Sequence, residues 1–549
     1  MKKMLSLLLI CALLAGCGSR NPSAAEAASP EAEDLPYVSR FKNETVIRLT
    51  DGEMDVTGVN SLSVFASRDI VYYEDRENYE SGNPYGEGED WERHTEEEAA
   101  AHTVINITAP GAYRVTGTLP AGQIRVDLGD DASEDEHAVV ELILDGLDIT
   151  CTVAPAIVFQ NVYECDGNWS TDTAKPDVDT ALAGANLVLA GENTVTGSHV
   201  AKIFKDKDGE KKLWKQDGAI YSYMSMNVWG PGSLILNADN EGMDTELHLT
   251  VNGGEISIRS DNDGINTNED GVSVTTINGG RLHIAAGLGA EGDGIDSNGY
   301  LVINGGTVVA SANPASDAGL DSDLGSFIHG GTVIAMGSAM DWAESDSDQV
   351  TMNLQFASYQ APDSTIAVTK EDGTLVFAYD PGEDEILGEN ARRYQGMILS
   401  CGSFRQGETY LLYADDTVTG THSAGIYDPG TVTDRSGGMQ LAYTGTDVMT
   451  RPGGMGGFGG GQRPDEGRRP EGGMPEGEMP SMPAGEMPTM PDGQQPPQGQ
   501  PGGEMGGEPP QMPGNGGFPG GREPGAGEAN TLFYMQDKVN FFTGLTPAE

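Results

Sequence analysis

A short acidic motif recurs in the middle of the chain. It consists of an acidic residue, a glycine, an apolar residue and then Asp or Asn, and copies begin at Glu241, Asp263 and Asp293. A related copy begins at Ala318, and another precedes them at Asp217. Carboxylate and amide oxygens are the hard ligands that Ca²⁺ takes at about 2.3–2.6 Å, usually six to eight at a time. Motifs stacked on one another would therefore form a row of calcium ligands.

Stacking would bring like charges together, because equivalent residues of successive parallel strands lie about 4.8 Å apart. Like charges that face each other destabilise strand pairing, and a cation between them removes that cost. The acids are also doubled: Asp293 and Asp296 flank one turn, and Asp317, Asp321 and Asp323 crowd another. Asp-Gly and Asn-Gly are also ordinary turn formers, so solvated turns are the alternative. The predicted calcium ligands are Asp217, Glu241, Asp244, Asp263, Asn266, Asp293, Asp296, Asp321 and Asp323.

A repeat in the same region indicates how such stacking would arise. Asn-Gly-Gly begins at Asn252, Asn278 and Asn304, and His329-Gly-Gly follows, at intervals of 26, 26 and 25 residues. Apolar residues keep register with this repeat in two columns, with period-two alternation typical of strands with one buried face. The columns are Ile256, Leu282, Val308 and Val333, and Ile258, Ile284, Ala310 and Ala335. A fixed repeat of this length, rich in glycine and without a helix or a leucine-rich signature, predicts an all-β solenoid, a right-handed parallel β-helix of about eight coils.

The rest of the chain suggests a tether, a cap and a biased segment. We expect a lipoprotein signal peptide and lipobox at 1–17 with Cys17 as the lipid-carrying residue, and a tether at 18–44. The β-helix would then occupy 45–348, and a β-rich cap 349–450. The segment 451–530 is rich in Gly, Pro, Met and Glu and is expected to be disordered, and 531–549 is strand-like.

The net charge of the chain limits the kinds of molecule that it can bind. The chain has 31 basic and 85 acidic residues, for a net charge of -54. Such a surface disfavours nucleic acid and anionic lipid and attracts divalent cations. With the N-terminal lipid as the anchor, we expect a monomer on the extracellular face of the cell membrane. The odd, sparse set of cysteines does not make a disulfide framework, although Cys151 and Cys165 could pair.

Aromatic side chains are the second kind of candidate, because a sugar ring can stack on an aromatic face. The candidate glycan-binding residues are Trp214, Tyr221, Tyr223, Trp229 and Trp342. The alternative is that these rings pack in the core or in the cap. Catalysis is not expected. The basic candidate that could abstract a proton beside a calcium ion is Arg259, four residues before Asp263, and a lone arginine on a strand is usually solvent-facing or salt-bridged.

Several segments resemble a family of bacterial surface proteins known as carbohydrate-binding domain-containing proteins. The resemblance spans about Thr45 to Gly420 and includes Gly111–Leu119, Gly122–Val126 and Leu142–Thr150. It continues with Asp217–Tyr221, the turns at Asp263 and Asp293 with their Asn-Gly-Gly partners, and Gln406–Tyr410, which is similar to the family's end cap. The Gly/Pro/Met segment and the Asp75–Glu98 insertion depart from the family pattern.

This resemblance implies a polysaccharide-lyase-like β-helix that binds calcium and attaches to cellulose or pectic polysaccharide without cleaving it. Calcium ligation carries over only to the Asp and Asn turn positions named above. Two other functions remain open at this stage. One is a calcium-dependent polysaccharide lyase, and the other is a structural adhesin or spacer that presents the biased segment to a partner.

Overall fold

The computed structural model describes residues 35–50, 53–73, 90–207, 210–446 and 529–548. The expected signal peptide with Cys17, most of the tether and nearly all of the Gly/Pro/Met segment lie outside these residues. The described part is all-β, and its α-helix is the six-residue α1 (Glu96–Ala101). No helix within it is long and apolar enough to cross a membrane.

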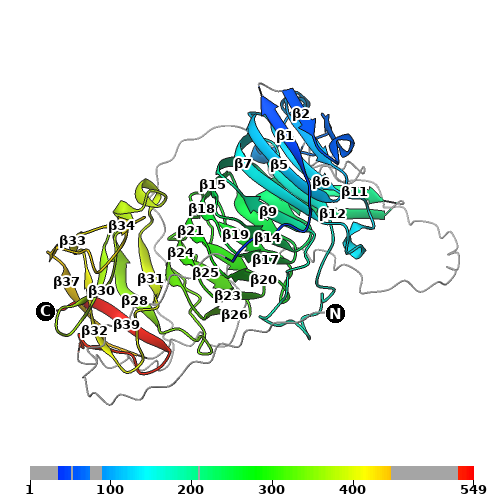
Figure 1. Ribbon diagram of the computed structural model, residues 1–549. Coiled ribbons are helices and arrows are strands. Elements are labelled where there is room, and N and C mark those ends of the chain that lie inside the picture. The colour runs from blue at the N-terminus through cyan, green and yellow to red at the C-terminus, as the bar shows by residue number, and fades with distance from the viewer. Residues whose placement is uncertain (1–34, 51–52, 74–89, 208–209, 447–528, 549) are drawn as a thin grey trace, which may run out of the picture. The chain divides into compact units, whose positions relative to one another are not determined.

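Three ladders of parallel strands form the larger part of the structure (Figure 1). The first ladder contains, in order, β1 (Glu44–Thr50), β5 (Gly111–Leu119), β7 (Val140–Thr150), β10 (Glu192–Gly197), β15 (Ser233–Ala238), β18 (Glu255–Ser260), β21 (Arg281–Ala285), β24 (Thr307–Ser311) and β27 (Thr332–Gly337). The second runs from β7 through β9 (Ala185–Leu189), β14 (Met226–Trp229), β17 (His248–Val251), β20 (Val274–Ile277), β23 (Tyr300–Ile303) and β26 (Gly325–Ile328).

The third ladder is a sheet of its own and contains the acidic motifs. Its parallel strands are β4 (Thr103–Ile107), β6 (Gly122–Asp127), β8 (Ile157–Asn161), β13 (Gly218–Ser222), β16 (Glu241–Thr245), β19 (Ile265–Thr267), β22 (Ile295–Ser297) and β25 (Leu320–Ser322). At its other edge β3 (Val64–Ser67) pairs antiparallel with β4. Each sequence repeat thus contributes one strand to each ladder, as β18, β19 and β20 do.

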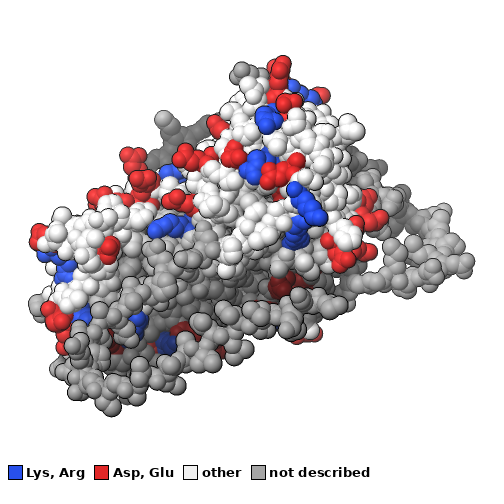
Figure 2. All heavy atoms as spheres, in the orientation of Figure 1, with Lys and Arg blue, Asp and Glu red and all other residues white. Residues whose placement is uncertain are grey.

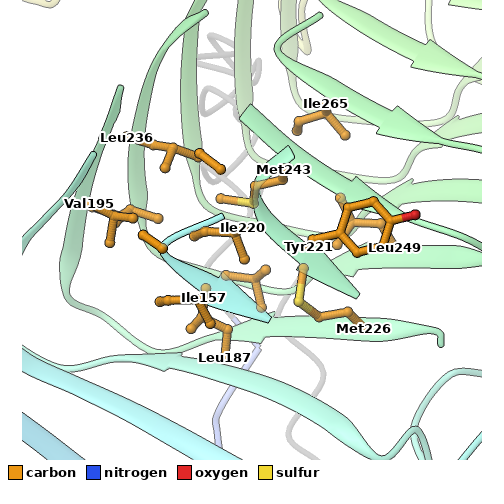
Figure 3. Packing of buried hydrophobic residues seen from close by; sticks show 14 of the residues in the cluster. Ile157, Leu187, Val195, Ile220, Tyr221, Met226, Leu236, Met243, Leu249 and Ile265 are labelled. Carbon is orange, nitrogen blue, oxygen red and sulfur yellow. The ribbon is translucent and has the colours of Figure 1, made fainter. Parts of the chain in front are cut away.

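The apolar columns read from the sequence are present strand for strand. Ile256 pairs with Leu282, Leu282 with Val308, and Val308 with Val333. These side chains are fully buried, and they belong to one continuous hydrophobic core. Figure 3 shows a part of this core in which Ile157, Ile220, Met243 and Ile265 come from successive strands of the third ladder.

Two insertions interrupt the regular repeats. Residues 162–182 form a segment without strands, and residues 199–215 include the antiparallel hairpin of β11 (Val200–Lys207) and β12 (Glu210–Gln216). Cys151 and Cys165, which the sequence left as possible partners, are both free thiols.

Beyond the ladders the strands become mainly antiparallel and have their own core. Strand β31 (Tyr394–Ser400) pairs antiparallel with β27 and also with β28 (Thr351–Gln360). The C-terminal β39 (Val539–Pro547) pairs parallel with β28. An antiparallel strand on β27 covers the edge that the first ladder would otherwise expose. The remaining strands of this region include β29 (Ile366–Lys370), β30 (Leu375–Tyr379), β32 (Thr409–Ala414), β37 (Met439–Ala442) and β38 (Phe533–Tyr534).

The glycine of the acidic motif is explained by a close approach between neighbouring repeats. A Cβ at Gly264 would lie 2.5 Å from the carbonyl oxygen of Gly294 and 2.3 Å from Cγ2 of Ile284. The same approach recurs one repeat earlier, where a Cβ at Gly242 would lie 2.4 Å from the carbonyl oxygen of Gly264. Only a residue without a side chain fits at these positions.

We therefore expect Gly264→Ala to destabilise the protein. Forcing a methyl group into a packed site costs about 1–3 kcal/mol, so the melting temperature should fall by several degrees. Gly167→Ala is the matched control, because a Cβ there meets nothing within 4 Å. Equal melting temperatures for the two variants in circular dichroism would contradict the assigned close approach.

Candidate functional site

The last residues of the four motifs that begin at Glu241, Asp263, Asp293 and Ala318 lie in a single row across the third ladder. Register pairs Asp244 with Asn266, Asn266 with Asp296, and Asp296 with Asp321. The apolar residue before each of them, such as Ile265, is buried in the core. Because side chains alternate along a strand, the polar residues are on the opposite face of the sheet. We call Asp244, Asn266, Asp296 and Asp321 the acidic row.

Three carboxyl groups meet at the start of this row. Asp217, Glu241 and Asp244 each offer an oxygen atom, and these atoms lie within 4.8 Å of one another. We call these residues the acidic cluster. Their exposed fractions are 7%, 4% and 0%. Oxygen ligands around one Ca²⁺ at about 2.3–2.6 Å are no more than about 5 Å apart, so the spacing suits a shared cation.

Among the side chains that the structure describes, one basic group reaches the acidic cluster. The Lys215 ammonium, on β12, forms an ion pair with the Asp217 carboxylate. Three ionised carboxylates and one ammonium give a formal charge of -3 + 1 = -2. Uncompensated buried charge is strongly unfavourable, and a divalent cation would neutralise this remainder.

Two oxygen atoms, one in the acidic cluster and one next to it along the acidic row, accept no hydrogen bond from the described residues. They are Oδ2 of Asp244 and Oδ1 of Asn266, and both are buried. The other polar atoms of these side chains are used: Asn268 Nδ2 donates to Asp244 Oδ1 at 2.8 Å, and Asn266 Nδ2 donates to Glu241 Oε2 at 3.3 Å. A buried acceptor without a partner costs about 1–3 kcal/mol. Asp217, Glu241, Asp244 and Asn266 therefore offer the hard oxygen donors that Ca²⁺ takes.

Burial makes the charged forms of these groups unfavourable. Burial away from water raises the pKa of Glu241 to about 7, and the negative charge of Asp217 is the second cause of this shift. Burial and the neighbouring Glu241 raise the pKa of Asp244 well above its usual value. The acidic cluster thus needs bound protons or a cation at neutral pH.

Other predicted ligands hold the backbone of the next repeat. The Asp293 amide donates to Asp263 Oδ1 at 2.7 Å, and the Ala318 amide donates to Asp293 Oδ1 at 2.5 Å. These two aspartates therefore stabilise turns, which was the alternative to calcium ligation in the sequence analysis. Asp296 and Asp321 are half-buried in the acidic row, and Asp323 is exposed. Among the described residues these five aspartates do not join the acidic cluster.

The predicted aromatic residues do not form one sugar-binding face. Tyr221 is fully buried and Tyr223 is 7% exposed, and their rings form an edge-to-face pair with centroids 5.0 Å apart. The Tyr221 hydroxyl donates to Glu246, and Gln216 Nε2 donates to the Tyr223 hydroxyl at 3.1 Å. Neither ring offers a face to a sugar, which corrects the expectation for these two residues. Tyr221 is instead paired in register with Asp244, and both side chains are fully buried.

The tryptophans have separate surroundings. Trp229 is partly buried, with its ring centroid 6.1 Å from that of Tyr37, and Trp342 is partly buried 6.2 Å from Phe541. The side chain of Trp214 lies outside the described residues. A role in sugar binding stays a prediction for all three.

Sequence reasoning missed a second polar assembly, centred on His199. Its Nδ1 lies 3.0 Å from Asp239 Oδ1, and its Nε2 lies 3.0 Å from Glu92 Oε1. Burial alone would lower the pKa of His199, but the hydrogen bonds to these two carboxylates raise it to about 10. No motif signals this assembly, because its members come from an insertion and two different repeats.

Calcium should stabilise the protein through the acidic cluster. At pH 7.5, saturating Ca²⁺ should raise the melting temperature by on the order of 5 °C relative to excess chelator. Asp244→Asn should lose most of this response, because it removes one charged ligand beside an unpartnered oxygen. Asp363→Asn, at an exposed position, should keep it. A calcium response that is unchanged in Asp244→Asn would contradict the assignment.

The calcium response should also depend on pH. Glu241 has a pKa of about 7 in the folded protein against an ordinary value of 4.5. Its contribution to stability is therefore present below about pH 4.5 and is lost as the pH rises through about 7. Calcium should cancel this loss, so the melting-temperature difference between calcium and chelator should grow from pH 5 to pH 8. Glu241→Gln should flatten the profile in chelator, and an identical profile in the wild type and this variant would refute the explanation.

Comparison with known proteins gives the chain its family. A carbohydrate-binding domain-containing protein of Acetivibrio thermocellus is 30% identical over 157 residues, which are 28% of this chain and 45% of that protein. The match thus spans less than half of the curated relative's length.

Two solved structures share weaker likeness. A polysaccharide lyase-like protein from C. thermocellum, solved as a gadolinium derivative, is 21% identical, with 52% of this chain and 92% of that chain covered and a TM-score of 0.31. The multi-modular cell-surface chitinase ChiW of Paenibacillus sp. str. FPU-7 is 14% identical over 61% of this chain and 24% of its own, with a TM-score of 0.11. Both TM-scores are too low to bear on the fold.

The family model described as carbohydrate-binding domain-containing protein matches residues 101–380, just over half of the 549 residues. The matched region includes the acidic cluster and the whole acidic row. This chain therefore belongs to the family of carbohydrate-binding domain-containing proteins.

Proposed function

We propose that this protein binds an extracellular polysaccharide, cellulose-like or pectic, without cleaving it. The observation that carries the proposal is the family match over residues 101–380. The family and the Acetivibrio relative are both described by what they bind and not by a reaction. A binding function also suits a rigid stack of strands that offers a long, fixed surface.

The scaffold of this proposal is a right-handed parallel β-helix stabilised by Ca²⁺. Support for the β-helix comes from the three parallel ladders and from the 25- or 26-residue repeats that supply one strand to each. Support for Ca²⁺ comes from the buried acidic cluster and the two unpartnered oxygens of Asp244 and Asn266. Bound there, the ion would supply positive charge and would fix neighbouring repeats in register. Asp217, Glu241, Asp244 and Asn266 would hold it.

Anchoring is the third part of the proposal. The lipobox ending at Cys17 and the short apolar run before it suit a lipoprotein displayed at the cell surface. The predicted tether, 18–44, would then connect the lipid to the first ladder, and its described part already contacts the ladders, where the Arg40 amide donates to Glu141. Both features lie largely outside the described residues, so they rest on the sequence alone.

The polysaccharide lyase is the alternative that this proposal sets aside. Arg259, the basic candidate for such a reaction, lies on β18 of the first ladder, and its guanidinium donates to the Glu385 carbonyl at 3.4 Å. The acidic cluster belongs to the third ladder. No observation brings Arg259 to that cluster, so nothing favours a role in proton abstraction.

Retention on insoluble polysaccharides tests the proposed function. The full chain without its lipid should be retained by cellulose or by calcium-crosslinked pectate, and the supernatant should contain no unsaturated sugars absorbing in the ultraviolet. Because calcium stabilises the scaffold, Asp244→Asn should lower retention at temperatures at which its fold loosens, and Asp363→Asn should not. A wild-type protein that no insoluble glycan retains would refute the binding function. The appearance of unsaturated products would favour the lyase.

A further inference from the structure

Trp91 is unusually exposed for a tryptophan. It is 75% exposed, whereas Trp169, Trp229 and Trp342 are partly buried. It lies in the short 3-10 helix η3 (Asp90–Glu92), in the acidic insertion that departs from the family pattern. A residue so exposed contributes little to packing, and leaving an indole in water costs hydrophobic free energy. Its position therefore calls for a reason other than stability of the fold.

The segment that carries Trp91 is fixed to the ladders by its neighbour, Glu92. The Glu92 carboxylate contacts the ring of His199, which is 7% exposed, and the other ring nitrogen contacts Asp239. Ser198 Oγ completes the assembly by donating to Asp239 Oδ2 at 2.6 Å. Ser198 and His199 follow β10, and Asp239 follows β15, so two neighbouring repeats hold the insertion in place.

The contacts among Glu92, His199, Asp239 and Ser198, which we call the clamp, present the Trp91 indole as a fixed ring on the surface. The ring centroids of Trp91 and His199 are 6.2 Å apart with an angle of 53° between the planes. A ring held in position before binding loses less conformational entropy when a ligand arrives. The Asp239 carboxylate, which contacts the other side of the His199 ring from Glu92, is 51% exposed, and an ionised carboxylate is an acceptor for hydroxyl donors.

We propose that Trp91 is the stacking platform for a neutral β-linked polysaccharide, with Asp239 as an acceptor for its hydroxyl groups. This proposal rests on the proposed carbohydrate-binding function and names a residue and a ligand class for it. An indole combines a large apolar face with little conformational freedom. A β-linked glucopyranose, with its hydroxyl groups equatorial, presents a flat face of C–H groups that matches it.

The negative charge of the protein near Trp91 favours a neutral glycan over an acidic one. Glu92 and Asp239 both contact the His199 ring next to Trp91, and the positive charge of protonated His199 offsets only one of their two negative charges. Figure 2 shows further acidic side chains over the face in view, with fewer basic ones, and the whole chain carries -54. A uronate chain would be repelled there, whereas a neutral glucan would not.

Substitution of Trp91 tests the platform in the full chain. On insoluble cellulose, Trp91→Ala should bind about tenfold more weakly than the wild type, a loss of about 1.4 kcal/mol, with an unchanged melting temperature. Trp91→Phe should restore part of the affinity. Phe65→Ala is the matched control, because Phe65 is also an exposed aromatic residue, at 49%, and lies on β3 outside the clamp. Its binding should equal that of the wild type.

Three results would overturn the inference. Equal binding by Trp91→Ala and the wild type would remove Trp91 from the site and leave the proposed function standing. A larger loss on pectate than on cellulose would show that the ligand class is acidic. If the wild type itself binds no insoluble glycan, the proposed function fails and this inference fails with it.

Discussion

Parallel stacking brings acidic side chains of successive repeats next to one another, and this constraint governs the rest of the site. Asp244, Asn266, Asp296 and Asp321 are paired in register, so they cannot avoid one another as side chains on a loop could. At the start of the row the chain adds Asp217 and Glu241 and buries all three carboxyls of the cluster. Charge placed this way is tolerated only with a compensating partner, whether protons, Lys215 or a divalent cation. A cation bound there would also satisfy the unpartnered oxygens of Asp244 and Asn266.

The acidic motif serves two purposes in adjacent repeats. Asp263 and Asp293 accept backbone amides of the following repeat, which fixes the register at each turn. Asp244 and Asn266, in contrast, direct one oxygen each away from any donor among the described residues. The glycine between the two polar positions lets the repeats approach closely enough for both arrangements. One short motif therefore positions the backbone and, at one end of the row, brings carboxylate oxygens together.

The regular part of the structure follows from the sequence, and the irregular part does not. Period-two alternation and the 26-residue spacing give the core columns and the alignment of the acidic row, because both depend only on register along a repeat. The ion pair of Lys215 and the Glu92–His199–Asp239 clamp both involve residues of insertions. Insertions break the register, so no spacing in the sequence relates their residues to the ladders. That is why an exposed tryptophan with a fixed position was missed. For Tyr221 and Tyr223 the sequence left sugar binding and core packing both open, and both side chains are buried.

Anomalous diffraction from crystals grown with Ca²⁺ or a lanthanide tests the central claim most directly, because it locates the ion without reference to stability. The account predicts an anomalous peak between Asp217, Glu241, Asp244 and Asn266, with carboxylate and amide oxygens at about 2.3–2.6 Å for Ca²⁺. A map with no peak there, in which Lys215 and protonated carboxyls fill the site at saturating metal, would contradict it.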